Sequence, residues 1–331
     1  MEEMSYDYPH SDGSVEQKSY NSSEDGSYVS SENERQQRKR RKTKETLKQD
    51  QISAMPDSIL LHILSFVPTK EAVKTGTLSR RWLNLWTFVP NLHFTCISFH
   101  SHDISKFVTV VDQTLTLHKG CGLKKFTVNF EYENSFASHV DSWVRFATRA
   151  NVEELCLDLY GLRDPSVNED HYALPQDLYT NSSITKLSVS FCDIVLRGSI
   201  GWKSLKSLSI RFTRLSEDVI QKILVGSPVL EFLDLDGFIG FNRLDIGSVS
   251  LRKLVVRDYW DLTREGVYSS LEISAPNLQS LSILGRMCRK KFRLMNIQSL
   301  VECNLKFGLE VYYEDSDNDF AVHRKSVKRT S

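Results

Sequence analysis

The chain lacks paired cysteines, long apolar runs and an excess of charge of one sign, and each absence excludes a class of protein. Its six cysteines are scattered through 331 residues without a C-x-x-C pair. A secreted disulfide scaffold is shorter and denser in cysteine, so we expect reduced thiols in an intracellular protein. The longest apolar run, 59–67, is interrupted by His62 and is far too short to span a membrane.

The formal net charge is zero, so the whole molecule has no field of one sign to attract nucleic acid or a membrane. This balance conceals an asymmetry. Residues 1–34 contain nine acids and one base, Lys18, whereas residues 35–48 contain eight bases and one acid, Glu45. The acidic, serine-rich start does not resemble a signal peptide.

Catalytic and metal-binding motifs are also missing. The sequence contains no G-x-S-x-G, no Walker loop and no H-E-x-x-H. His100 and His102 form an H-x-H pair, but no nearby cysteine or carboxylate cluster completes a metal site, so we expect exposed loop histidines. We predict no metal, no cofactor and no enzymatic activity in this chain itself.

Residues 1–49 have almost no aliphatic side chains and no hydrophobic period, so we expect this segment to be disordered. Within it, residues 35–44 read RQQRKRRKTK. Such a run suits the acidic grooves of nuclear import carriers, and the predicted import residues are Arg38, Lys39, Arg40, Arg41 and Lys42. We therefore expect a nuclear location and leave the cytoplasm open. The alternative is a solvated charge block, while nucleic-acid binding is disfavoured because no aromatic residues interleave with the charges.

Residues 50–92 contain three short helical patterns separated by turn residues. The first has apolar residues at i, i+1, i+4, i+5 and i+8, namely Ile59, Leu60, Ile63, Leu64 and Val67. Pro68 ends this pattern, and a second short helix is expected at 70–75, ending at Gly76. Ser79 is expected to cap a third helix, which Pro90 ends. The apolar face is too large for so small a unit to bury alone, so we expect a partner to cover it.

This segment resembles the F-box found at the front of plant F-box proteins with leucine-rich repeats. The residues that carry the resemblance are Asp50, Ile52, Ser53, Pro56, Asp57, Ile59, Leu60, Ile63, Leu64, Ser65, Pro68, Thr69, Lys70, Val73, Leu78, Ser79, Arg81, Trp82, Leu85, Trp86 and Pro90. The resemblance implies a three-helix module that binds a Skp-type adaptor and, through it, a cullin–RING ubiquitin ligase. The alternative is a helical subdomain packed wholly on its own chain.

The predicted adaptor-binding residues are Pro56, Ile59, Leu60, Ile63, Leu64, Val67, Val73, Leu78 and Trp82. Some of them must instead pack the helices against one another, and the sequence does not separate the two sets.

After this segment the chain repeats the phrase L-x-x-L-x-L with apolar substitutions. Eight phrases begin at Leu123, Val152, Ile184, Leu205, Leu230, Leu251, Leu278 and Leu300. Their starts are 29, 32, 21, 25, 21, 27 and 22 residues apart, near the period of leucine-rich repeats. Each phrase predicts a short strand whose fourth and sixth positions point into a core shared with its neighbours. Return helices are expected at 216–225 and 139–150.

The repeats also resemble those of plant F-box/leucine-rich-repeat proteins, as in SPVLEFLDLDGF and APNLQSLSILG. Many relatives carry a further C-terminal FBD domain, which we expect to be missing or truncated here. Within the repeats, Cys192 occupies a buried repeat position and Cys303 replaces a core leucine, so neither is suited to forming a thioester.

Positions three, five and seven of each phrase are expected on the exposed concave face of the strands. Their charges alternate in sign along the array, which suits a protein ligand better than a nucleic acid. The predicted target-binding residues are Lys186, Arg211, Phe232, Asp234, Asp236, Lys253 and Arg257. Arg211, Lys253 and Arg257 leave open an anionic cofactor, and any single position is better explained as a solvated residue.

Together these features predict an α+β protein in which a three-helix F-box precedes an α/β leucine-rich-repeat solenoid. The expected segments are a disordered tail at 1–49, the F-box at 50–95, about eight repeats at 96–313 and a charged tail at 314–331. The expected function is substrate recognition for an SCF-type ubiquitin ligase, which brings a target protein close to a charged conjugating enzyme. The alternative is a nuclear interaction scaffold acting outside a ligase, and a repeat-domain hydrolase or transferase is a remote third.

Overall fold

The computed structural model describes residues 35–38, 52, 54–96, 101–119, 122–160, 171–258, 270–288, 291–310 and 324–325. The chain divides into two units, 1–55 and 56–331, and the packing described below lies within the second. In the first unit, residues 35–38 are helical and exposed. Of the predicted import residues, Arg38 belongs to this stretch, and the other four lie outside the described residues.

The second unit begins with short helices that meet at turns. They are α2 (Asp57–Leu64), α3 (Thr69–Lys74), η1 (Thr75–Thr77), α4 (Arg80–Leu85) and η2 (Trp86–Phe88). Pro56 and Pro68 occupy the N-cap positions of α2 and α3, and Ser79 occupies that of α4 without a side-chain capping bond. Between helices, Arg81 Nε donates to Asp57 Oδ1 at 2.8 Å.

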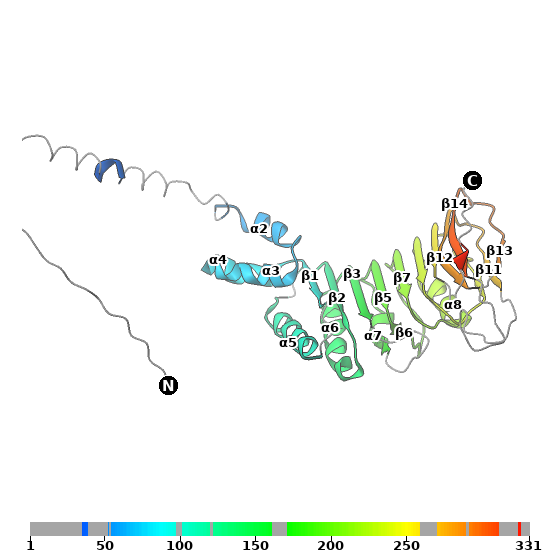
Figure 1. The fold of residues 1–331 in the computed structure, drawn as a ribbon, viewed down its shortest axis with the longest axis horizontal. Helices are drawn as coiled ribbons and strands as arrows, with labels where there is room; N and C mark the ends of the chain where they lie inside the picture. Colours follow the sequence, from blue (N-terminus) through cyan, green and yellow to red (C-terminus); the bar gives the residue numbers. More distant parts are fainter. Residues whose placement is uncertain are drawn as a thin grey trace, which may run out of the picture. The chain divides into compact units, whose positions relative to one another are not determined.

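The main sheet has ten strands in the order β1-β2-β3-β5-β7-β8-β10-β12-β14-β15, and they lie side by side in Figure 1. All neighbouring pairs are parallel except the last, β14 with β15. The strands are β1 (Asn91–Thr95), β2 (Lys125–Glu131), β3 (Glu154–Tyr160), β5 (Lys186–Ser190), β7 (Ser207–Arg211), β8 (Phe232–Asp236), β10 (Lys253–Arg257), β12 (Ser280–Cys288), β14 (Glu302–Glu310) and β15 (Arg324–Lys325).

Each of the eight repeated phrases forms a strand that begins at its third position, as predicted. Neighbouring strands pair the same phrase positions, so Leu208 faces Leu233 and Leu233 faces Leu254. In the first seven phrases the fourth and sixth side chains are at most 2% exposed. The apolar side chains of each strand therefore pack against those of the next strand, and we call this row of buried side chains the apolar ladder. Each strand is stabilised through its neighbours.

The last phrase departs from the prediction. Cys303, expected in the core, is exposed, and Leu305 is 48% exposed. Among the residues that the structure describes, β14 is paired on its outer side at Leu309 and Glu310 alone, by β15.

Strand β1 was missed because residues 50–95 were assigned to the helical segment. Val89, Leu92 and Phe94 repeat the L-x-x-L-x-L spacing and are at most 5% exposed. They therefore form a ninth copy of the phrase, and the first strand of the sheet directly follows the short helices.

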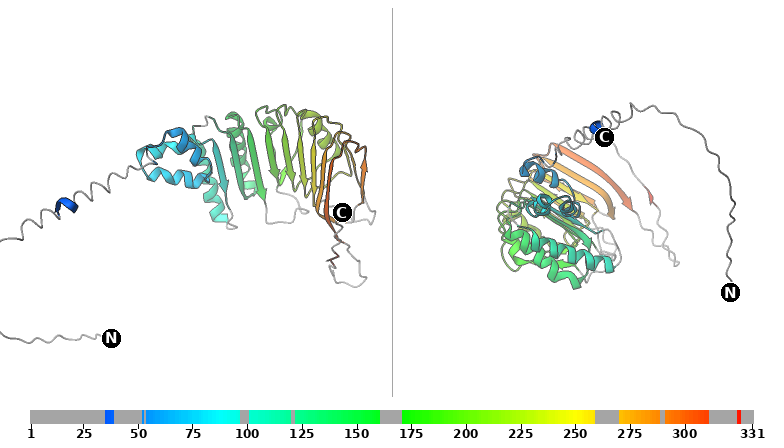
Figure 2. Two further views of the ribbon diagram at one scale, coloured as in Figure 1. Left: turned by 90° about the horizontal axis from the view of Figure 1, so that it is seen from above. Right: turned by 90° about the vertical axis from the view of Figure 1, so that its left-hand side faces the viewer.

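Helices cover the face of the sheet that carries the apolar ladder. These are α5 (Ser101–Leu117), α6 (Ala137–Arg149), α7 (Gln176–Tyr179) and α8 (Glu217–Gly226), and Figure 2 shows the helices grouped on one side of the strands. The predicted helices at 139–150 and 216–225 are confirmed as α6 and α8. Ser216 caps α8 by accepting a hydrogen bond from the Val219 N–H at 3.2 Å.

Helix α5 was not predicted, and its presence corrects the expectation of loop histidines. His102 lies within α5, and His100 lies outside the described residues.

The later return segments are strands rather than helices. β9 (Arg243–Asp245), β11 (Ser270–Ser274) and β13 (Lys291–Met295) form a second parallel sheet, and β4 (Tyr172–Ala173) pairs with β6 (Cys192–Asp193).

A row of left-handed residues follows the strands of the main sheet. The residue directly after position seven has positive φ in five successive repeats, at Phe191, Phe212, Gly237, Asp258 and Gly285. The backbone N–H groups of four of them donate to the neighbouring strand, as Phe212 N does to Asp236 O at 2.8 Å. The turn thereby satisfies backbone donors at the edge of the sheet.

In the part of the chain that the structure describes, no helix combines the length and the apolar character needed to cross a bilayer.

Candidate protein-interaction surfaces

Helix α2 buries one side and exposes apolar side chains on the other. Leu60 and Leu64 are 0% and 3% exposed, whereas Ile59, Ile63 and Phe66 are 47%, 45% and 75% exposed. We call the last three residues the α2 ridge. Ile59 and Ile63 lie on one face of α2, and Phe66 continues their spacing two residues beyond the end of the helix. The Phe66 ring meets His62 edge-on with centroids 4.8 Å apart.

More apolar surface is exposed on the neighbouring helices. Leu78 is 67% exposed, and Leu83 of α4 is 57% exposed. So much exposed apolar surface in a short segment is typical of a protein–protein contact.

The structure separates the predicted adaptor-binding residues into two sets. Leu60, Leu64 and Trp82 are buried and hold the helices together, while Val67 and Val73 are half-buried. The exposed members are Pro56, Ile59, Ile63 and Leu78.

Phe66 and Leu83 were not predicted to lie on this surface. Phe66 could have been found by extending the spacing of Ile59 and Ile63 by three residues. No comparable signal identifies Leu83, because it directly follows the buried Trp82.

Two buried contacts fix the helical segment to β1. The Thr69 hydroxyl is 1% exposed and accepts from the His93 N–H at 2.6 Å, and Asn91 Nδ2 donates to Ser65 O at 3.1 Å. Burial, assisted by Lys125, lowers the pKa of His93. These bonds join α3 and the end of α2 to the first strand, so the α2 ridge has a defined position relative to the sheet.

The predicted target-binding residues lie on the sheet face opposite the apolar ladder, and three of the seven, Lys186, Asp234 and Arg257, form ion pairs across strands. Glu154 lies between Lys186 and Lys125, at 3.3 Å and 3.6 Å. Arg257 Nη1 is 3.5 Å from Asp234 Oδ2. Charges of both signs are therefore mixed along the row, although the adjacent strands β5 and β7 both carry a cation, Lys186 and Arg211.

Phe232 and Lys253 occupy position three of adjacent strands and face each other in register. Phe232 is half-buried and Lys253 is exposed. They provide one apolar and one cationic group near the centre of the row.

Two aspartates on this face carry oxygens without a hydrogen-bond partner, Asp234 Oδ1 and Asp236 Oδ1. Asp234 was predicted to contact a target, yet it is only 5% exposed. Asp236 lies in register between Arg211 and Arg257. An anionic cofactor held by those arginines would meet the Asp236 carboxylate, so the arrangement disfavours such a ligand.

Within the described residues, no group of three or more His, Cys, Asp or Glu side chains is placed to hold a metal ion. Cys192 is fully buried, and burial raises the pKa of its thiol. A protonated, buried thiol is a poor nucleophile, which agrees with the buried position predicted for Cys192.

Comparisons with known proteins match both halves of this arrangement. The F-box domain model matches residues 52–94, and the model described as "FBD-associated F-box protein At5g56370, LRR repeats" matches residues 140–303. The chain is 34% identical to F-box/LRR-repeat protein At5g02910 of Arabidopsis thaliana, over 80% of this chain and 54% of that protein. It is 30% identical to F-box protein At5g03100 of the same plant, over 79% of this chain and 78% of that protein.

A third Arabidopsis thaliana relative, F-box/LRR-repeat protein At3g03360, is 30% identical over 77% of this chain and 51% of its own length. The chain thus spans about half the length of the F-box/LRR-repeat proteins that it matches.

Proposed function

Because the chain belongs to the plant F-box/leucine-rich-repeat family, we propose that it is a substrate-recognition subunit of an SCF-type cullin–RING ubiquitin ligase. The F-box helices form the three-helix module that binds a Skp-type adaptor. The repeats form a solenoid whose exposed strand face binds the protein to be modified.

The α2 ridge carries the adaptor proposal. Two large apolar side chains on one face of α2 and a third just beyond its end remain exposed, although Leu60 and Leu64 of the same helix are buried. Covering them with a partner releases the water that they order and contributes about 25 cal/mol for each Å² buried. An adaptor with an apolar groove would supply that cover.

The strand face supports the target proposal. It carries charges of both signs, and ion pairs hold Lys186, Asp234 and Arg257 in place, so it presents a patterned surface of defined geometry. Such a surface favours a partner with the complementary pattern and repels others. The chain itself performs no ubiquitin chemistry in this proposal, because tethering raises the local concentration of the target beside a conjugating enzyme.

Adaptor binding can be tested with the double variant I59E/I63E of the full chain. Two carboxylates in an apolar contact carry a large desolvation cost, so co-purification of a Skp-type adaptor and a cullin should be abolished. The matched control is V249E, which changes an apolar residue that is 74% exposed and lies outside the F-box. Undiminished adaptor binding by the double variant would refute the proposal.

The rival function is a nuclear interaction scaffold that works without a ligase. For this function we expect that neither a Skp-type adaptor nor a cullin co-purifies with the wild-type chain, while other partner proteins do.

We also propose that the basic run directs the protein to the nucleus. The support is the density of five consecutive bases from Arg38 to Lys42. Replacing all five by glutamine in a fluorescent fusion should shift the protein to the cytoplasm. An unchanged nuclear signal would exclude this role.

A further inference from the structure

A groove of about 800 Å³ lies between α5 and α6, on the helical side of the sheet. Its lining includes Leu115, Thr116 and Lys119 from the α5 side and Arg145, Phe146 and Arg149 from α6. We call this space the α5/α6 groove. It is distinct from the α2 ridge and lies opposite the strand face proposed to bind a target.

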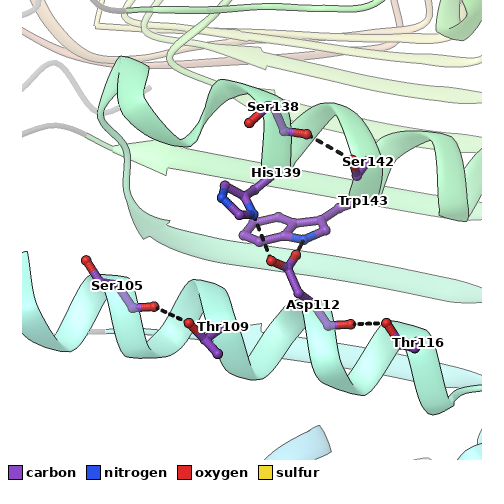
Figure 3. A network of polar contacts seen from close by, with 8 residues as sticks. All are labelled: Ser105, Thr109, Asp112, Thr116, Ser138, His139, Ser142 and Trp143. Atoms are coloured by element: carbon purple, nitrogen blue, oxygen red, sulfur yellow. Dashed lines mark hydrogen bonds and ion pairs between the residues drawn. The ribbon is translucent and has the colours of Figure 1, made fainter.

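One carboxylate bridges the two helices beside the groove. Asp112 of α5 accepts from Trp143 Nε1 through Oδ1 at 2.6 Å, and its Oδ2 lies 2.7 Å from His139 Nδ1. Figure 3 shows this bridge, with Asp112 on one helix and both partners on the other. Since Trp143 is 1% exposed, the bridge fixes the separation of the helices and gives the groove a defined width.

The cations around the groove are not neutralised within it. Lys119, Arg145 and Arg149 are all exposed, and among the described residues none of them forms an ion pair. Asp112 is the one carboxylate of the lining, and both of its oxygens are engaged by His139 and Trp143. The groove therefore presents an excess of positive charge above an apolar floor that includes Leu115 and Phe146.

We propose that the α5/α6 groove is a docking site for an acidic peptide segment of a partner protein. Carboxylates of the segment meet Lys119, Arg145 and Arg149, and an apolar side chain between them contacts Phe146 and Leu115. Charge complementarity at the rim supplies steering and specificity, and the apolar contact supplies burial. This inference does not rest on the proposed ligase function, because it concerns a separate surface and a separate partner.

A simpler explanation of the cations is helix stabilisation. Lys119 and Arg149 lie at the C-terminal ends of α5 and α6, where cations interact favourably with the helix dipole. Arg145 lies a full turn before the end of α6, where that effect is weak. The two explanations differ in their consequences, because helix stabilisation predicts a loss of stability and docking predicts a loss of binding.

The test uses the full chain and a fluorescein-labelled peptide of glutamate and glycine around a single leucine. Fluorescence anisotropy should detect binding, and R145E/R149E should weaken it by at least about tenfold. Raising the salt from about 0.1 M to about 1 M shortens the Debye length from about 10 Å to about 3 Å, so the wild-type affinity should fall. A peptide with glutamine in place of glutamate should bind at least about tenfold more weakly.

The control is K203E/R252E, which makes the same change in net charge at two exposed bases outside the groove and should leave the affinity unchanged. Thermal unfolding of R145E/R149E checks its fold, and R145Q/R149Q is a milder replacement if reversal unfolds the chain. Equal weakening by both charge-reversal pairs would overturn the proposal, as would equal affinity for the two peptides. A single-stranded RNA provides a further comparison. If it binds more tightly than the acidic peptide and R145E/R149E abolishes that binding, the groove recognises phosphate and the proposal is overturned.

Discussion

At Gly237 the left-handed backbone has a specific steric cause. Its φ is +59°, and a Cβ built there would lie 2.4 Å from Cδ1 of the Phe212 ring. Phe212 itself stacks on Phe191 with ring centroids 4.8 Å apart, so the ring has little freedom to move. Glycine is required here both by the dihedral angle and by the ring.

Substitution G237A should therefore lower the free energy of unfolding by about 1–3 kcal/mol, measured by urea denaturation. The control is G247A, where a Cβ would meet nothing within 4 Å and φ is not left-handed. That variant should stay within about 0.5 kcal/mol of the wild type. Equal effects of the two substitutions would contradict the steric explanation.

Asp236 gives a prediction about pH. Burial, followed by the carboxylates of Asp258 and Asp234, raises the pKa of Asp236 above its ordinary value. A carboxyl with a higher pKa in the folded chain opposes folding once it is ionised, and this cost disappears at low pH. D236N should thus be more stable than the wild type at about pH 7, with an advantage that shrinks as the pH approaches about 4. Urea midpoints across this range measure it, and an advantage independent of pH would count against the cause given.

At the scale of the element, α2 shows how one helix serves two purposes. Adjacent residues of similar volume, Ile59 and Leu60, are 47% and 0% exposed. Leu60 packs the F-box helices, whereas Ile59 belongs to the α2 ridge. The same period that builds the core also leaves a second face for a partner.

Substitution L60A should cost about 2–5 kcal/mol of stability, because it leaves a cavity in a packed core. I59A should cost less than about 1 kcal/mol and yet weaken adaptor binding in the proposed function. Denaturation and adaptor titration of the two variants separate these roles. A greater stability loss in I59A would show that Ile59 is a core residue.

At the scale of the whole molecule, the repeats share one core, and its ladder is open at β14. Leu305 stands where every earlier strand buries its apolar residue, and Val301 is 87% exposed. Parallel strands with an uncovered apolar end tend to associate with other chains.

The double variant V301K/L305K should reduce association between copies of the chain with only a small change in the unfolding midpoint, since Val301 is 87% exposed and Leu305 is 48% exposed. Sedimentation velocity over a range of concentrations measures the association. The control is V225K, a lysine placed at another exposed valine, on α8 (81% exposed). Reduced association in the control alone would show that the end of the sheet is not responsible.

What the sequence determined by itself is the position of the repeated strands and of the elements with strong local signals. The phrase L-x-x-L-x-L predicted eight strands at the correct positions, and Ser216 with Gly226 predicted α8, because both signals lie within a few residues of chain. The residues that carry the F-box resemblance likewise predicted short helices between Pro56 and Pro90. Strand β1 was within reach, since Val89, Leu92 and Phe94 carry the same spacing.

Only the tertiary structure decided which side chain of each element stays in water. Leu60 and Ile59 are alike in a sequence pattern, and they differ because the packing of the chain around α2 buries one and leaves the other exposed. Asp234 is buried and Cys303 is exposed for the same reason, since burial depends on strands that are distant in the chain. The α5/α6 groove also depends on a bond between Asp112 and Trp143, 31 residues apart, which no local signal encodes.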